Sequence, residues 1–135
     1  MTALTQDRQT PRRASHEFVF PVAAATKIYG GSLVCLNATG YATKGATSTT
    51  LKCVGMADGM ADNSAGANGD IRVKVKRGCY KFANSASTDQ ITLADVGASA
   101  YIVDDQTVAK TSGSGTRSIA GTIRDVEADG VWIDF

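Results

Sequence analysis

The sequence has a single histidine, His16, and no phosphate-binding loop of the form G-x-x-x-x-G-K-[ST]. A catalytic nucleophile that relies on histidine would need that residue inside the fold, whereas His16 lies in a polar stretch near the start of the chain. The glycine-rich segment 113–118 (GSGTRS) lacks the lysine of a nucleotide-binding loop, and we interpret it as a flexible loop. We therefore expect no enzyme activity, no catalytic residue and no cofactor.

Acidic residues in the spacing of a metal site are also lacking. Asp104 and Asp105 are adjacent, so on a strand end their side chains point apart, and the calcium-loop spacing is absent. Asp58, Asp62 and Asp70 surround a loop rich in Asn and Gly, where a weak cation site is the alternative to a simple turn. No ligand spacing supports that alternative, and we expect no metal.

The three cysteines, Cys35, Cys53 and Cys79, are odd in number and widely spaced, which favours neither a disulfide framework nor a zinc site. Each lies in a short apolar run, so we expect three small buried side chains. No apolar run approaches the roughly 18 residues of a membrane span. The polar N-terminal residues do not resemble a secretory signal. We expect a protein made in a reducing cytoplasm that has no membrane partner.

Aromatic residues make up only 7% of the 135 residues, while glycine occurs 14 times. Abundant small and turn-forming residues are typical of an all-β domain with many connections, and this length suffices for one hydrophobic core. One helical turn at 91–96, ending at Gly97, is the only helix that we expect. Short apolar or alternating runs bounded by turn residues predict strands at 17–22, 32–37, 41–43, 52–57, 71–76, 80–82, 101–103, 108–110, 119–126 and 131–135.

Five residues allow more specific predictions. Pro21 cannot donate a backbone hydrogen bond, so its strand should lie at a sheet edge. Gly78 stands where the alternation changes parity, which predicts a bulge or sharp bend. Asp129-Gly130 predicts a primed hairpin turn, and segment 58–69 reads as a loop. Trp132, on the last strand, is expected in the core. Such short strands predict a small barrel or sandwich.

Residues 1–16 show no apolar periodicity and predict an extended N-terminal arm, followed by a single β-rich domain over 17–135. We expect the arm to lie across a neighbouring subunit; the alternative is that it docks on its own domain. The arm carries Arg8, Arg12 and Arg13 against Asp7. The last residues are acidic, and opposite charge at the two ends suits head-to-tail contacts, unless both ends are simply solvated.

A basic stripe on the strand at 71–76 is the other candidate binding surface. Alternation places Arg72, Lys74 and Lys76 on one face. A nucleic-acid groove would add exposed aromatics, and Tyr80 and Phe82 share that parity. The net charge of +1 and the lack of a recognised module argue against nucleic acid. A solvated face, or one that meets an acidic partner, is favoured.

Two stretches, 62–85 and 101–135, carry a resemblance to a known family. The first combines a turn, a basic alternating strand, a glycine and an aromatic pair. The second combines paired aspartates in a hairpin, a glycine-rich loop and a closing D-G-V-W hairpin. From about Ser15 onward the chain resembles the small capsid cement (head decoration) proteins of tailed phages. The resemblance implies a β-barrel or β-tulip-like body on the outer capsid surface, with an arm that reaches neighbouring subunits.

The expected partners are thus the major capsid protein and further copies of this chain, as a homotrimer at three-fold positions or a dimer at two-fold positions. The alternatives are another phage component, such as a tail tube or fibre base, or a nucleic-acid-binding barrel. The residues expected to bind the partner are Arg8, Pro11, Arg12, Arg13, Phe18, Arg72, Lys74 and Lys76.

Overall fold

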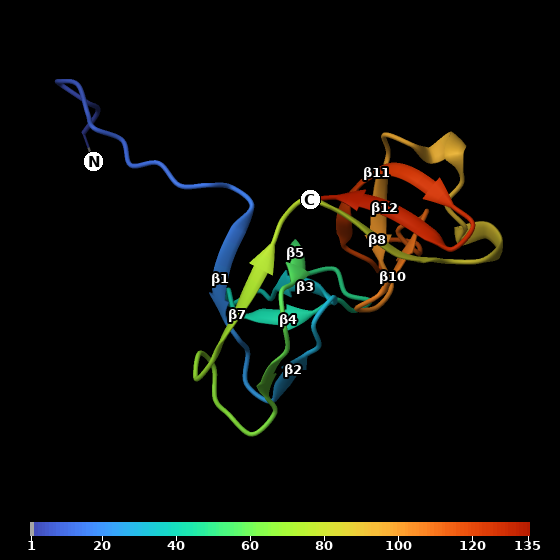
Figure 1. Cartoon of the computed structure of the whole chain (residues 1–135), viewed down its shortest axis with the longest axis horizontal. Coiled ribbons are helices and arrows are strands. Elements are labelled where there is room, and N and C mark those ends of the chain that lie inside the picture. Colours follow the sequence, from blue (N-terminus) through green and yellow to red (C-terminus); the bar gives the residue numbers. More distant parts are fainter. Residues whose placement is uncertain (1) are drawn as a thin grey trace.

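The computed structural model describes residues 2–135; Met1, the first residue of the expected arm, lies outside them. The fold is almost entirely β, with a closed barrel and an extended arm (Figure 1), which confirms the predicted fold class. Two single-turn 3₁₀ helices, η1 (Ser87–Asp89) and η2 (Leu93–Asp95), are the only helices in the described part of the chain; η2 lies within the helical turn expected at 91–96, and η1 was not expected. The strands are β1 Glu17–Pro21, β2 Thr26–Ile28, β3 Leu33–Leu36, β4 Ala42–Lys44, β5 Lys52–Ala57, β6 Ala61–Asn63, β7 Arg72–Lys76, β8 Cys79–Asn84, β9 Ser99–Ile102, β10 Thr107–Ala109, β11 Ile119–Glu127 and β12 Gly130–Asp134.

The first half of the body forms a lobe that we call the sheet lobe. Its five-stranded sheet has the order β1-β7-β5-β3-β4, and β2 pairs with β6 beside it. β1 is an edge strand, as Pro21 predicts. On β7, Val73 and Val75 are buried, because alternate residues of a strand point to opposite faces. They join Val22, Ile28, Val34, Ala42, Ala57 and Ala61 in one hydrophobic cluster.

The second half forms the barrel lobe, in which the strands close in the order β10-β8-β12-β11-β9. β8 and β10 pair in parallel, and the other neighbouring strands pair antiparallel. Leu33 and Cys35 of β3 belong to the barrel's hydrophobic cluster. The single domain expected over 17–135 is therefore built as two lobes that share core residues across β3.

Gly78 marks the crossing between the lobes. Its φ of 147° is disfavoured for residues with a Cβ, and it stands between β7 of the sheet lobe and β8 of the barrel lobe. The predicted bend at Gly78 is therefore the point where the chain passes from one sheet to another. It does not curl a single sheet into a barrel. Phe82 is buried in the barrel core, and Tyr80 is half-buried against it. The expectation that these two aromatics share a face with the basic stripe is wrong.

The C-terminal hairpin forms as predicted from β11 and β12, but its turn is not a primed one. A primed turn needs positive φ at its central residues, and within residues 2–135 neither Ala128, Asp129 nor Gly130 has it. Gly130 serves close packing: a Cβ there would lie 2.7 Å from Lys81 Cγ and 2.8 Å from the carbonyl oxygen of Phe82.

Trp132 is not a core residue. Its neighbours Val131 and Ile133 are fully buried in the barrel, so alternation turns Trp132 to the outer face, where it is only half-buried. The Lys81 ammonium lies 5.7 Å from the centre of its ring. Its Nε1 donates a hydrogen bond to Glu127 Oε1 at 3.2 Å. Trp132 was expected in the core, but its place in the alternation of β12 turns its side chain to the outer face.

Two further predictions are corrected. The segment 58–69 contains β6, and β2 was not predicted at all. Asn63 of β6 is buried, and its Nδ2 donates to the carbonyl oxygens of Ala23 and Ala67, at 2.9 Å each.

The expectation that all three cysteines are buried is also corrected. Of the three cysteines only Cys35 is fully buried; Cys53 is half-buried and Cys79 is exposed.

Candidate interaction surface

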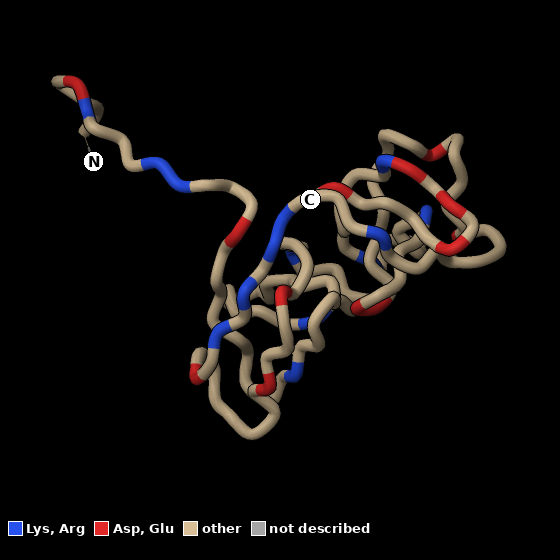
Figure 2. Tube along the Cα trace, viewed as in Figure 1, with Lys and Arg blue, Asp and Glu red and all other residues tan. Residues whose placement is uncertain are grey.

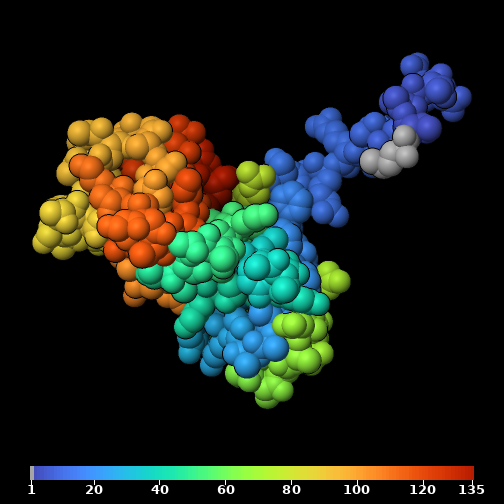
Figure 3. Space-filling view, turned by 180° about the vertical axis from the view of Figure 1, so that it is seen from behind, coloured from blue at the N-terminus to red at the C-terminus, as the bar shows by residue number. Residues whose placement is uncertain are grey.

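The N-terminal arm, residues 2–16, leaves the body beside β1 and projects away from both lobes (Figures 1 and 3). Every one of these residues is exposed, including Arg8, Pro11 and Arg12. Over residues 2–135 no ion pair involves an arginine of the arm. In this structure the arm therefore does not dock on its own domain, apart from contacts at its base.

The base of the arm contacts β1 through one cation–π pair. The guanidinium of Arg13 lies 5.5 Å from the centre of the Phe18 ring, and Phe18 stacks on Phe20 with centroids 6.3 Å apart. Arg13 and Phe18 line an open depression together with His16, Val19 and Arg72. Of the predicted binding residues, Arg13, Phe18 and Arg72 are therefore brought together, while Arg8, Pro11 and Arg12 lie farther out along the arm.

The basic stripe on β7 is partly neutralised by nearby acids. Lys74 Nζ lies 3.0 Å from Glu17 Oε1, and Lys76 Nζ lies 3.5 Å from Asp58 Oδ2. The hydrogen bond between Lys74 and Glu17 lowers the pKa of Glu17 and raises that of Lys74. Among the three stripe residues, Arg72, Lys74 and Lys76, only Arg72 has no ion pair within residues 2–135. Phe82 is buried in the barrel core and Tyr80 packs against it, so the two aromatics that were considered for a nucleic-acid groove do not accompany the stripe.

The acidic C-terminal strands likewise carry their own cations. Lys81 Nζ lies 2.8 Å from Asp129 Oδ2 and 3.5 Å from Glu127 Oε2, and Arg124 pairs with Asp134 at 3.2 Å. Figure 2 shows acidic and basic segments close together on the barrel, whereas the arm, with its basic segments and one acidic segment, stands apart from the body. The arm is therefore the less compensated of the two charged ends.

The backbone of β1 leaves hydrogen-bonding groups free at the sheet edge. The carbonyl of His16 accepts from Arg77, and the N–H of Val22 donates to Ile71, at 2.8 and 2.9 Å. Because bonding alternates along an antiparallel strand, the intervening N–H and C=O groups of Glu17 and Val19 point away from β7. The side chain of Val19 is 48% exposed. This edge can accept another extended segment.

A groove of about 490 Å³ lies between the two lobes, and sequence reasoning missed it. Phe18, Phe20, Cys53 and Val54 line one side, and Ala120 and Phe135 are among the residues on the other. Apart from Phe18, these residues were not predicted as part of a site. The groove exists only where β1 and β5 meet β11 and β12, a contact that no local pattern indicates.

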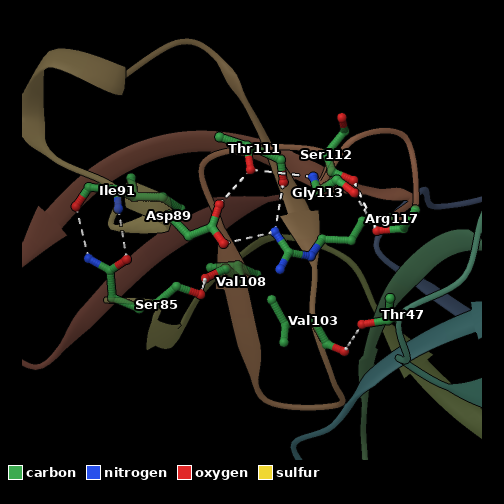
Figure 4. A network of polar contacts seen from close by, with 12 residues as sticks. Thr47, Ser85, Asp89, Ile91, Val103, Val108, Thr111, Ser112, Gly113 and Arg117 are labelled. Atoms are coloured by element: carbon green, nitrogen blue, oxygen red, sulfur yellow. Dashed lines mark hydrogen bonds and ion pairs between the residues drawn. The ribbon is translucent and has the colours of Figure 1, made fainter. Parts of the chain in front are cut away.

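The glycine-rich loop is held by an arginine of its own chain (Figure 4). Arg117 Nη1 donates to Asp89 Oδ2 at 3.2 Å and to the carbonyl of Thr111 at 3.1 Å. Thr111 Oγ1 donates to the other oxygen of Asp89. The Thr111 hydrogen bond, with further help from Arg117, lowers the pKa of Asp89. The segment is a loop, as its composition predicts, but these hydrogen bonds hold it in place, so the expectation that it is flexible is not met.

Residues 2–135 hold no group of three or more side chains placed to bind a metal ion. Across the same residues, no helix has the length and apolar character to cross a membrane. Comparisons with protein families, with curated proteins and with solved structures found no match to this chain.

Proposed function

We propose that this chain is a capsid cement protein that binds the outer surface of a tailed-phage shell and stabilises it without catalysing a reaction. The observation that carries the proposal is the arm. It extends away from the body, is exposed at every described residue, and holds three arginines without an ion pair of their own. Beyond the contact of Arg13 with Phe18, such an extended basic segment gains further contacts by meeting another molecule.

The body supplies a second contact next to the first. Val19 and the free backbone groups of β1 lie beside the depression that contains Arg13, Phe18 and Arg72. Main-chain hydrogen bonds at a sheet edge give affinity, and neighbouring side chains give specificity. The partners in this proposal are the major capsid protein and other copies of the chain, in a homotrimer or a dimer.

Attachment at two or more points explains how modest contacts hold firmly. Once the body is bound, the arm meets its own site at a high effective concentration, so the combined affinity exceeds either affinity alone by orders of magnitude. A stable contact requires on the order of 1,000 Å² of buried surface in total. The arm adds surface without enlarging the folded core.

The test is co-sedimentation of the purified protein with undecorated capsids of the phage or prophage that encodes it. The full chain should saturate the shells and raise their resistance to heat. A variant without residues 2–16 should remain folded, because neither core cluster includes the arm, and should bind at least 10-fold more weakly. Leu93→Ser, at an exposed site on η2 far along the chain, is the control and should bind normally.

A full chain that fails to bind the shells would overturn the proposal. Binding to isolated tails, with none to capsids, would instead indicate the alternative role of a tail component. Equal binding by the truncated and full chains would remove the arm from the mechanism.

A further inference from the structure

Two cysteines face each other across neighbouring strands of the sheet lobe. Cys35 of β3 and Cys53 of β5 are directly opposed partners in the antiparallel ladder. Both belong to the barrel-side cluster: Cys35 is a fully buried member, and Cys53 packs against it. Since the two side chains are opposed and pack in the same cluster, the sulfur atoms lie on the same face of the sheet.

The geometry of such a pair is close to that of a disulfide. Directly opposed residues have Cβ atoms about 4.5–5.5 Å apart, and a disulfide needs about 3.5–4.5 Å. The ladder shifts register between Val34 and Cys35, which places Val54 as an extra residue beside the pair. A bulge of this kind allows a local adjustment without moving the rest of the sheet.

The two thiols differ in access. Cys53 is half-buried and lines the groove between the lobes, whereas Cys35 is fully buried. An oxidant therefore reaches Cys53 first. Cys79, the third cysteine, is exposed on β8 and is paired across its ladder with Asp134. It belongs to the other lobe and is not part of the pair.

We propose that Cys35 and Cys53 form an intramolecular disulfide when the protein meets a low-molecular-weight disulfide such as oxidised glutathione. The thiolate of Cys53 attacks one sulfur of the oxidant and releases one glutathione thiolate. The thiolate of Cys35 then attacks the Cys53 sulfur, which breaks the mixed disulfide and releases the second glutathione. The two protein thiols lose two electrons and two protons, and the oxidant is reduced to two thiols.

The buried partner controls the rate of closure. A hydrogen bond with the Cys53 thiol, together with burial, raises the pKa of the Cys35 thiol. Because the thiolate is the attacking form, the second step is slow at neutral pH and becomes faster as pH rises. The pair would stay reduced in a cytoplasm and close slowly in oxidising surroundings.

The test uses the Cys79→Ser protein, which removes the exposed thiol and leaves the opposed pair. After incubation with oxidised glutathione, the intact mass should fall by about 2 Da, as expected for loss of two hydrogens. A digest should contain a peptide pair joined between Cys35 and Cys53. The melting temperature should rise by on the order of 10 °C for a closed loop of this length, and dithiothreitol should reverse the rise.

The matched control adds Cys53→Ser, which should keep one free thiol and show neither the mass loss nor the shift. A stable glutathione adduct on Cys53, or two free thiols after prolonged oxidation at pH 8.5, would overturn the proposal. Because peptide mapping reads the linkage directly in the Cys79→Ser protein, the result stands even if the control folds poorly. No capsid is needed, so the outcome is independent of the proposed function.

Discussion

The Lys81 ammonium lies 5.7 Å from the centre of the Trp132 ring and binds Asp129 at 2.8 Å on the same outer face of the barrel. The only tryptophan of the chain thus lies at the surface beside the Lys81–Asp129 ion pair. Its neighbours Val131 and Ile133 are buried in the core. The inward-pointing and outward-pointing side chains of β12 should therefore contribute differently to the stability of the fold.

We expect Ile133→Ala to destabilise the protein by about 2–5 kcal/mol, because it leaves a cavity in the closed barrel. Trp132→Ala should cost less, about 1–2 kcal/mol, for a cation–π contact and one hydrogen bond at the surface. Urea unfolding of both variants measures the difference. Equal losses would mean that Trp132 contributes to the core after all.

Replacing Arg117 with Ala should release the glycine-rich loop. The guanidinium binds Asp89 and the carbonyl of Thr111, and the side chain is only 17% exposed. Loss of these charged hydrogen bonds should cost about 1.5–3 kcal/mol. Proteinase K should also cut segment 111–116 faster. A cleavage rate equal to that of the unchanged protein would contradict the anchoring role of Arg117.

Asp89 should make stability depend on pH in the acid range. Its pKa is lowered from the ordinary 3.8 by the Thr111 hydrogen bond and by Arg117. A carboxyl group with a lowered pKa in the folded state stabilises above its unfolded pKa, and this stabilisation is lost as pH falls through the folded value. The melting temperature should therefore drop below about pH 4, and Asp89→Asn should flatten that part of the drop. Asp7→Asn, in the arm, is the control and should follow the unchanged curve.

If the arginines of the arm contribute to capsid binding, the affinity for capsids should fall as the salt concentration rises. Replacing Arg8, Arg12 and Arg13 together with Gln should weaken capsid binding and make it less sensitive to salt, since exposed charges are screened over about 8 Å at physiological ionic strength. Arg124→Gln removes an exposed arginine that is already paired with Asp134 and should change binding little. Identical salt curves for the triple variant and the unchanged protein would contradict a role for these charges.

Local patterns predicted most of the strands because alternation and turn residues coincide along them. β5 matches its predicted bounds, Lys52–Ala57, and Pro21 marks a true edge. β2 and β6 escaped prediction because each contains only one apolar residue, Ile28 and Ala61, and therefore shows no apolar alternation. The buried amide of Asn63 in β6 also bonds to the carbonyl oxygen of Ala23, 40 residues earlier, a contact that no local pattern indicates.

The candidate surface was predicted in part. The charges of the arm are visible in the sequence, but the finding that none of its arginines has an ion pair within residues 2–135 depends on the folded body. The basic stripe was also visible, yet its neutralisation by Glu17 and Asp58 depends on strand order. Tyr80 and Phe82 were misplaced because a parity count cannot show that the chain changes sheets at Gly78.

Closure of the barrel determines where the molecule can grow by strand pairing. Each of the five barrel strands has a neighbour on both sides, so that lobe cannot accept an added strand along its wall. The end strands of the five-stranded sheet are β1 and β4, both in the other lobe, and part of the β4 edge is already bridged by Val22. Any assembly that extends a sheet from one molecule into the next must therefore begin in the sheet lobe, and the barrel can meet its surroundings only through side chains and loops.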